Sequence, residues 1–201
     1  MKIMCMGDSI TFGYGLKDLS QRWSDLLATR TGDTMVNFGI NGDTTSGMLV
    51  RCHMQVFPQK PDAMLLLGGT NDICRTYDYH QAFANIVSMI QHAKAVGIPV
   101  IVGIPLPFVP ERFGQHEWCF DRNNEHVTEQ CERLAQVLRA YCTAREVPYV
   151  DYRSAFLKED GAVRAELFSD ALHPNVAGHQ VMADVLFEKL QQLYGRNKKL
   201  V

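Results

Sequence analysis

The fold is decided near the amino terminus by the stretch Lys2-Ile3-Met4-Cys5-Met6-Gly7-Asp8-Ser9. Its first five residues form a short, largely apolar run, which is typical of a strand buried on both faces of a sheet. A glycine-rich, turn-prone segment follows at residues 10–15. Ser9 therefore stands at the carboxyl end of a strand, in the crevice where open α/β sheets bind ligands. A hydroxyl held there can attack a substrate, provided that a base reaches it.

Similar short apolar segments recur along the chain, and each is bounded by Gly, Pro, Asp or Asn, as strands usually are. The five strands that we expect span residues 2–6, 34–38, 63–67, 100–103 and 147–150. Between them, apolar residues repeat at helical spacing. The clearest predicted helices span residues 79–96, 124–145 and 175–194, and weaker signals cover 22–31 and 45–56.

This alternation predicts an α/β fold. Parallel strands need crossover connections, so the pattern implies a five-stranded parallel sheet with helices on both faces. We expect the flavodoxin-like strand order 2-1-3-4-5, which places the first strand centrally. No repeat, low-complexity segment or linker marks a boundary, so we expect residues 1–201 to form a single domain.

Composition is that of an ordinary globular protein. Apolar residues make up 46% and charged residues 21% of the 201 residues, and a chain of this size buries about 70% of its unfolded surface without disulfide or metal support. The net charge of −2 argues against nucleic acid or an anionic membrane surface as the main partner. Every apolar stretch is shorter than the ~20 residues that span a bilayer, so we expect no stable membrane insertion.

The six cysteines are scattered and form no C-x-x-C pair. Cys5 lies in the first predicted strand, and Cys131 and Cys142 fall on the apolar face of a predicted helix. Buried reduced thiols are therefore favoured over a zinc site or a disulfide framework. Because Ser9 stands so close to the start, we expect no signal peptide ahead of the first strand, and a cytoplasmic protein.

Four polar motifs follow predicted strands or precede the last helix. They are Gly7-Asp8-Ser9, Gly39-Ile40-Asn41-Gly42-Asp43-Thr44, Gly68-Gly69-Thr70-Asn71-Asp72 and Asp170-Ala171-Leu172-His173-Pro174. Each motif alone is more typical of a turn or a capped helix start than of a catalytic centre. Their occurrence together, in this order and at one edge of the predicted sheet, indicates a catalytic site.

These motifs contain the groups that a serine nucleophile requires. The Ser9 hydroxyl needs a base, and histidine suits that task near neutral pH. His173 needs in turn an acceptor that fixes its tautomer, and Asp170 stands three residues before it. The oxyanion that forms from an ester carbonyl needs donors, which the backbone N–H groups of Ser9 and Gly42 and the Asn71 side chain can supply.

With these motifs the chain resembles the SGNH hydrolases, also called the GDSL esterase/lipase family. That family carries a Ser in a G-D-S motif, a Gly, an Asn in a G-x-N-D motif and a D-x-x-H pair. The matching positions here are Gly7-Asp8-Ser9, Gly42, Gly69-Thr70-Asn71-Asp72, Asp170 and His173. The one departure is Ile10, which stands where the family name has leucine.

The resemblance implies a three-layer α/β/α sandwich and the hydrolysis of carboxylic esters through an acyl-enzyme, without a metal or other cofactor. It makes Ser9 the nucleophile, His173 the base and Asp170 the residue that orients the base. Ser9, Gly42 and Asn71 form the oxyanion hole in this interpretation. The expected partner is a small-molecule ester with a small or short acyl group. Thioesters and lysophospholipids are alternatives for the same site.

The longest irregular stretch spans residues 105–123, and a loop of that length is often a lid or a binding loop. Its aromatic residues either anchor the loop to the core or line a pocket over Ser9, and the sequence leaves both readings open. Asp8, Phe108 and Trp118 are the further candidates for substrate binding.

A different class of function is a flavin- or nucleotide-binding module of flavodoxin-like fold. Gly13-Tyr14-Gly15 superficially suggests a phosphate loop, but the chain has neither G-x-x-x-x-G-K-[ST] nor a full G-x-G-x-x-G. A binding module would also leave Asn71 and the pair of Asp170 and His173 without a role. We therefore favour the ester hydrolase.

Overall fold

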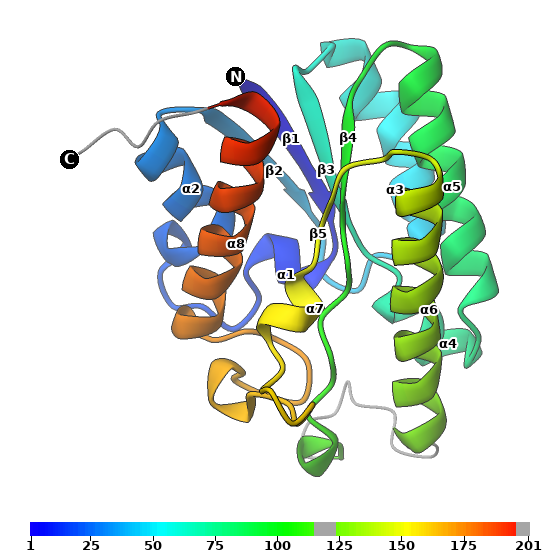
Figure 1. Ribbon diagram of the computed structural model, residues 1–201, viewed down its shortest axis with the longest axis vertical. Helices are drawn as coiled ribbons and strands as arrows, with labels where there is room; N and C mark the ends of the chain where they lie inside the picture. The colour runs from blue at the N-terminus through cyan, green and yellow to red at the C-terminus, as the bar shows by residue number, and fades with distance from the viewer. Residues whose placement is uncertain (115–123, 196–201) are drawn as a thin grey trace.

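A computed structural model describes residues 1–114 and 124–195 of the chain. These residues form one parallel sheet with strands β1 (Lys2–Gly7), β2 (Thr34–Gly39), β3 (Ala63–Leu67), β4 (Val100–Gly103) and β5 (Tyr149–Val150). The strand order is β2-β1-β3-β4-β5. The predicted α/β class, parallel pairing and central first strand are thereby confirmed (Figure 1).

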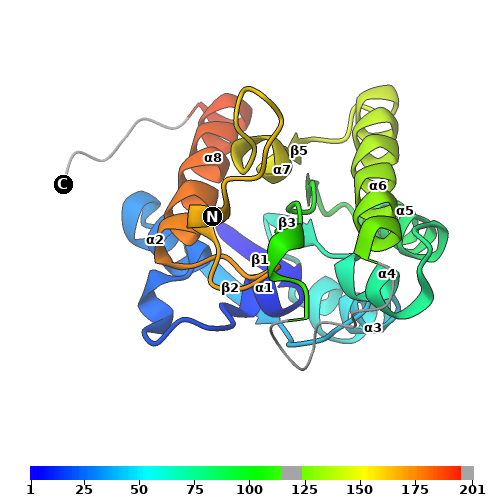
Figure 2. The ribbon, with the colours of Figure 1, turned by 90° about the horizontal axis from the view of Figure 1, so that it is seen from below.

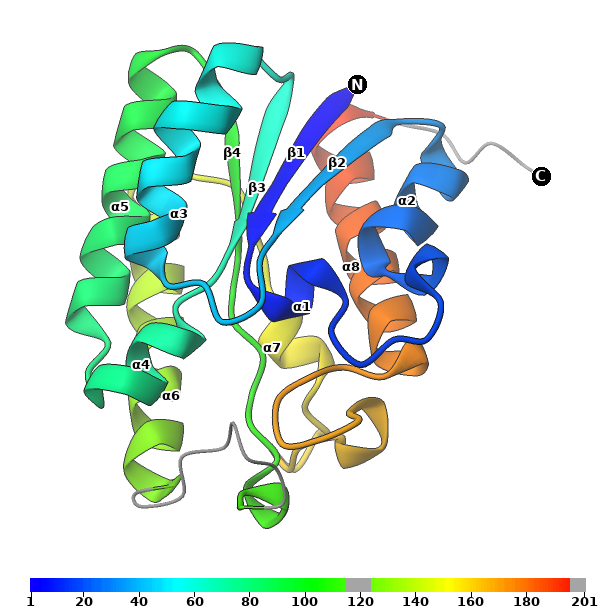
Figure 3. The ribbon, with the colours of Figure 1, turned by 180° about the vertical axis from the view of Figure 1, so that it is seen from behind.

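Helices cover both faces of this sheet. The α-helices are α1 (Ser9–Phe12), α2 (Trp23–Thr31), α3 (Thr45–Arg51), α4 (Thr70–Thr76), α5 (His80–Ala95), α6 (Asn124–Ala144), α7 (Tyr152–Ala155) and α8 (Val176–Tyr194). A π-helical turn, Cys52–Val56, continues α3, and short 3₁₀ turns span Leu19–Gln21, Phe57–Gln59, Pro110–Arg112 and Ala165–Leu167. Helices α2 and α8 pack together on one face, and α3, α5 and α6 lie on the other (Figures 1 and 3). The result is the three-layer α/β/α sandwich.

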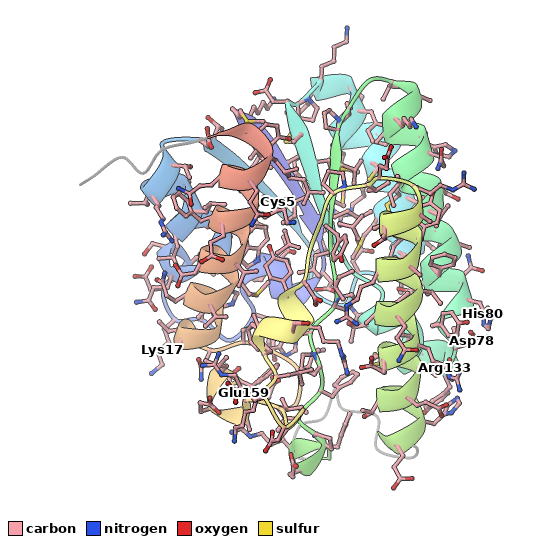
Figure 4. The ribbon with its side chains drawn as sticks, in the orientation of Figure 1. Cys5, Lys17, Asp78, His80, Arg133 and Glu159 are labelled. Atoms are coloured by element: carbon pink, nitrogen blue, oxygen red, sulfur yellow. The ribbon has the colours of Figure 1, made fainter. Side chains whose placement is uncertain are left out.

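The core follows from the apolar runs of the central strands. All five residues of β3 and all four of β4 are buried, as are five of the six residues of β1, whereas the edge strand β2 is at best half-buried. Cys5 lies in the interior between the sheet and α8 (Figure 4). Cys5, Cys52, Cys131 and Cys142 are free thiols. Burial raises the pKa of Cys52 to about 12, so it stays protonated near neutral pH.

The strand predicted at residues 147–150 is shorter than expected, because only Tyr149–Val150 pairs with β4. The Val147 N–H donates to the Cys142 carbonyl and so closes the end of α6. Pro148 has no N–H to donate to a neighbouring strand.

No helix in the described part of the chain is long and apolar enough to cross a membrane.

The segment after Ser9 is also different from the turn that its glycines suggest, because residues 9–12 form the helical turn α1. The Asp8 side chain caps it by accepting the Ile10 N–H at 2.9 Å. A Cβ added to Gly39 would lie 2.1 Å from the Phe12 nitrogen, so only glycine lets β2 end this close to α1. This close packing fixes Ser9 at the carboxyl edge of the sheet.

Candidate active site

The four polar motifs meet at the carboxyl ends of the strands, which face the viewer in Figure 2. Ser9 opens α1 directly after β1, Gly42 lies in the loop after β2, and Asn71 lies in the first turn of α4 after β3. Asp170 and His173 come from the loop that precedes α8. The structure therefore brings together residues that are up to 164 positions apart.

Ser9, His173 and Asp170 form a continuous hydrogen-bonded chain. The Ser9 Oγ lies 2.8 Å from His173 Nε2, and His173 Nδ1 lies 2.7 Å from Asp170 Oδ2. All three side chains are buried. This is the arrangement in which an imidazole can take a hydroxyl proton on one nitrogen while a carboxylate holds the other.

The surroundings of Asp170 favour its ionised form. Burial alone would raise its pKa, but hydrogen bonds from the His173 side chain and from backbone N–H groups outweigh burial and leave the pKa below its usual value. Its Oδ1 accepts the N–H groups of Leu172 at 2.8 Å and of His173 at 2.6 Å. Because an ionised carboxylate has no proton to donate, Nδ1 carries the imidazole hydrogen and Nε2 presents its lone pair to Ser9.

The loop that carries Asp170 and His173 is braced from two sides. The Ser169 N–H and hydroxyl both donate to the His173 carbonyl, at 2.8 and 3.0 Å. From the other side, the Val109 N–H donates to the Ala171 carbonyl at 2.8 Å. Arg112 Nη1 donates to the Phe168 carbonyl at 2.9 Å. The described part of the long 105–123 stretch thus holds the loop of Asp170 and His173 in place.

The candidate oxyanion donors are the backbone N–H groups of Ser9 and Gly42 and the Asn71 side chain, and these residues line the same cavity as His173. Gly42 adopts a left-handed conformation with φ of +73°. The Asn71 amide nitrogen donates one hydrogen to the Asp43 carbonyl at 2.9 Å, which leaves its second hydrogen for another acceptor. As the first residue of α1, Ser9 has a backbone N–H without a partner inside the helix. All three residues line one cavity.

The loop that contains Gly42 is tied to the sheet by Arg51. The guanidinium pairs with the Asp43 carboxylate at 2.5 Å. It also donates to the Phe38 carbonyl at 2.7 Å and to the Gly7 carbonyl at 3.2 Å. One side chain thereby links the ends of β1 and β2 to the Gly42 loop.

The cavity beside Ser9 holds about 420 Å³ and is lined mainly by apolar surface. Its lining comprises Ser9, Tyr14, Asn41, Gly42, Asn71, Cys74, Arg75, Leu172 and His173. Tyr14 is not among the residues predicted for the site, yet its ring centre lies 4.5 Å from that of His173. Cys74 and Arg75 were not predicted either. Helical spacing places both about one turn after Asn71, so a helix predicted at 70–76 would have indicated them.

The proposed substrate-binding residues fare differently. Phe108 is a correction: its ring is 1% exposed and packs against Phe113 at 5.0 Å, so it belongs to the core and does not line the cavity. Asp8 is buried beneath α1 as its cap, and burial raises its pKa to about 6. Trp118 lies outside the described residues. Within the residues that the structure covers, no three His, Cys, Asp or Glu side chains are placed to hold a metal ion.

Comparison with known proteins finds relatives along nearly the whole chain. The model of the GDSL-like Lipase/Acylhydrolase family matches residues 5–181. Esterase TesA of Pseudomonas aeruginosa is 29% identical over 197 residues, which cover 95% of this chain and 88% of the relative. The acetylxylan esterase of Geobacillus stearothermophilus is 26% identical over 172 residues, which cover 79% and 73%.

The fold has close counterparts among solved structures. A GDSL-like lipase from Bacteroides thetaiotaomicron matches with a TM-score of 0.77 at 26% identity, and the match covers 96% of this chain and 88% of that one.

Proposed function

Because the chain belongs to the GDSL-like lipase/acylhydrolase family and is a carboxylic ester hydrolase, we propose a mechanism for it. We propose that it is a serine esterase that works through an acyl-enzyme on Ser9. The observation that carries the proposal is the buried chain from Ser9 Oγ through His173 to Asp170, with contacts of 2.8 and 2.7 Å. Such a chain activates a hydroxyl that is otherwise a weak nucleophile.

In the first half of the proposed reaction, Ser9 Oγ attacks the ester carbonyl while its proton passes to His173 Nε2. The new bond joins Oγ to the carbonyl carbon, and the carbonyl oxygen becomes an oxyanion. Asp170 stabilises the imidazolium that forms. The bond to the leaving alcohol then breaks, and the alcohol oxygen takes the proton from Nε2. The acyl group is left on Ser9.

In the second half, water attacks the acyl-enzyme, and His173 takes its proton and returns one to Ser9 Oγ as the acid leaves. Both halves pass through an oxyanion, which we assign to the backbone N–H groups of Ser9 and Gly42 and to the Asn71 amide. Donors fixed in advance stabilise such an oxyanion without reorganisation during the reaction. The left-handed Gly42 and the bond from Asn71 to Asp43 support this assignment.

We infer that the substrates are small or short-acyl esters. A cavity of about 420 Å³ is near the lower end of the range for small-molecule sites. The similarity to an acetylxylan esterase supports a small acyl group as well.

The variant Ser9→Ala tests the proposal. It should lose nearly all turnover of a chromogenic acetate ester while its thermal unfolding stays cooperative, because only the nucleophile is removed. A panel of esters and thioesters of increasing acyl length, with Ser9→Ala as the blank, then ranks the substrates. A maximum at long acyl chains would reject the short-acyl inference, and retained turnover in Ser9→Ala would reject the mechanism.

A further inference from the structure

Arg75 occupies a defined place in the wall of the cavity. It lies on α4 one turn after Asn71, and its Nη2 donates to the Gly42 carbonyl at 2.9 Å. Together the two side chains hold the successive carbonyls of Gly42 and Asp43. The guanidinium is therefore held against the Gly42 loop at the cavity wall, although the residue is exposed.

The charge of Arg75 is not neutralised by a carboxylate in the described part of the chain. Other arginines do pair with a carboxylate: Arg51 pairs with Asp43, and Arg139 pairs with Asp151. Arg75 takes part in none of the ion pairs between described residues. The hydrogen bond to the Gly42 carbonyl uses one of the five N–H donors of Arg75 and leaves the positive charge of the guanidinium unchanged.

No aspartate or glutamate is among the described residues that line the cavity, so none of them competes for this charge. Most of the lining surface is apolar. A neutral substrate gains little from a cation in such a wall. An anionic substrate gains charge-assisted hydrogen bonds with a planar guanidinium, which suits carboxylates and phosphates.

We propose that Arg75 binds an anionic group of the substrate, so that the enzyme prefers esters that carry a carboxylate or phosphate near the ester bond. This inference rests on the proposed serine esterase and adds a substrate class to it. Because Arg75 is exposed to solvent, the preference weakens as the salt concentration rises.

Two matched substrate pairs test the proposal and locate the anion. On the alcohol side, 4-acetoxybenzoate is compared with its methyl ester. On the acyl side, mono-4-nitrophenyl adipate is compared with 4-nitrophenyl hexanoate. The measured quantity is the ratio of kcat/KM for the anionic ester to kcat/KM for the neutral ester, in the wild type and in Arg75→Met. Background hydrolysis is subtracted with Ser9→Ala.

The wild type should prefer the anionic ester in at least one pair, and Arg75→Met should lower that ratio about tenfold or more, mainly through KM. Arg75→Lys keeps a positive charge and should keep part of the preference, which separates loss of charge from loss of fold. Arg133→Met is the matched control, because Arg133 projects from α6 toward Asp78 and His80 and pairs with Glu129 (Figure 4). It should leave the ratio unchanged.

A wild type without preference for either anionic ester overturns the proposal. So does an equal loss on both members of a pair in Arg75→Met, because Arg75 would then only hold the Gly42 loop. Neither result bears on the proposed mechanism, which Ser9→Ala tests separately.

Discussion

The two walls of the cavity are built in opposite ways. On one side, Ser9 and His173 line the cavity and Asp170 lies behind His173. These residues are 5%, 4% and 4% exposed, and hydrogen bonds join them in a continuous chain. On the other side, Gly42 and Asn71 are half-buried and Arg75 is exposed. There, the side chains of Asn71 and Arg75 each donate one hydrogen bond to a backbone carbonyl. Their remaining N–H groups can donate to another acceptor.

This difference indicates how the work is divided. The hydrogen bonds of the buried side are complete without a substrate, so in the proposed mechanism this side is preorganised for bond making and proton transfer. The more exposed wall gains partners only when a substrate or its oxyanion arrives. Changes on the buried wall should therefore act mainly on kcat, whereas changes on the exposed wall should also alter which substrates are preferred.

The largest effect is expected from breaking the buried wall with Asp170→Asn. An amide at this position can donate to Nδ1 and so favour the wrong tautomer of His173, which should lower kcat about 10⁴-fold with little change in KM. Steady-state kinetics of 4-nitrophenyl acetate hydrolysis measure both kcat and KM of the variant. A loss of less than about tenfold would mean that the buried chain does not orient the base.

The next effect tests the exposed wall through Asn71→Ala, which should lower kcat about 10²–10³-fold because it removes an oxyanion donor. Asn71→Asp is the matched variant, since it keeps the shape of the side chain but has no hydrogen to donate when ionised. It should be at least as impaired. If either variant keeps more than a tenth of the wild-type kcat, Asn71 has no part in the oxyanion hole.

The smallest effect concerns Asp8, which lies beneath Ser9 as the cap of α1. Burial raises the pKa of Asp8 from 3.8 to about 6. The folded chain then binds this proton more tightly than the unfolded chain does. The folded state is therefore favoured by Asp8 below about pH 4, and this contribution is lost as pH rises through about 6. The loss amounts to about 3 kcal/mol.

Asp8→Asn should remove this dependence while its side-chain oxygen still caps α1. We expect the free energy of unfolding of the variant, relative to the wild type, to rise between pH 4 and 6 and then stay constant. Denaturant unfolding across that range measures the difference. A difference that does not change with pH would show that Asp8 titrates normally in the folded protein.

The sequence predicts the buried wall better than the exposed one, for a physical reason. Ser9 follows a strand end and His173 precedes a helix start, and the strand and the helix are both recognisable from the local sequence. Arg75 is positioned by a hydrogen bond to a carbonyl 33 residues away in the sequence, and no local sequence pattern predicts that contact. The helix that presents it starts after Gly69 at φ of +111°, in a motif that reads as a turn.

Phe108 shows the same limit within the core. An aromatic residue in an irregular stretch gives no periodicity from which to tell a core ring from a cavity ring. Its burial depends on Phe113 and on the docking of the 105–114 segment onto the Asp170 loop. The central position of β1, in contrast, was predictable, because a strand with apolar residues on both faces is buried between other layers.

The most direct test of the central claim is to trap the acyl-enzyme. Wild-type protein is mixed with 4-nitrophenyl acetate and quenched in acid within the first turnovers, and the protein and its peptides are weighed by mass spectrometry. We predict the gain of one acetyl group on the peptide that contains Ser9, and no gain in Ser9→Ala. An acetyl group on another residue, or wild-type turnover by Ser9→Ala, would contradict the account.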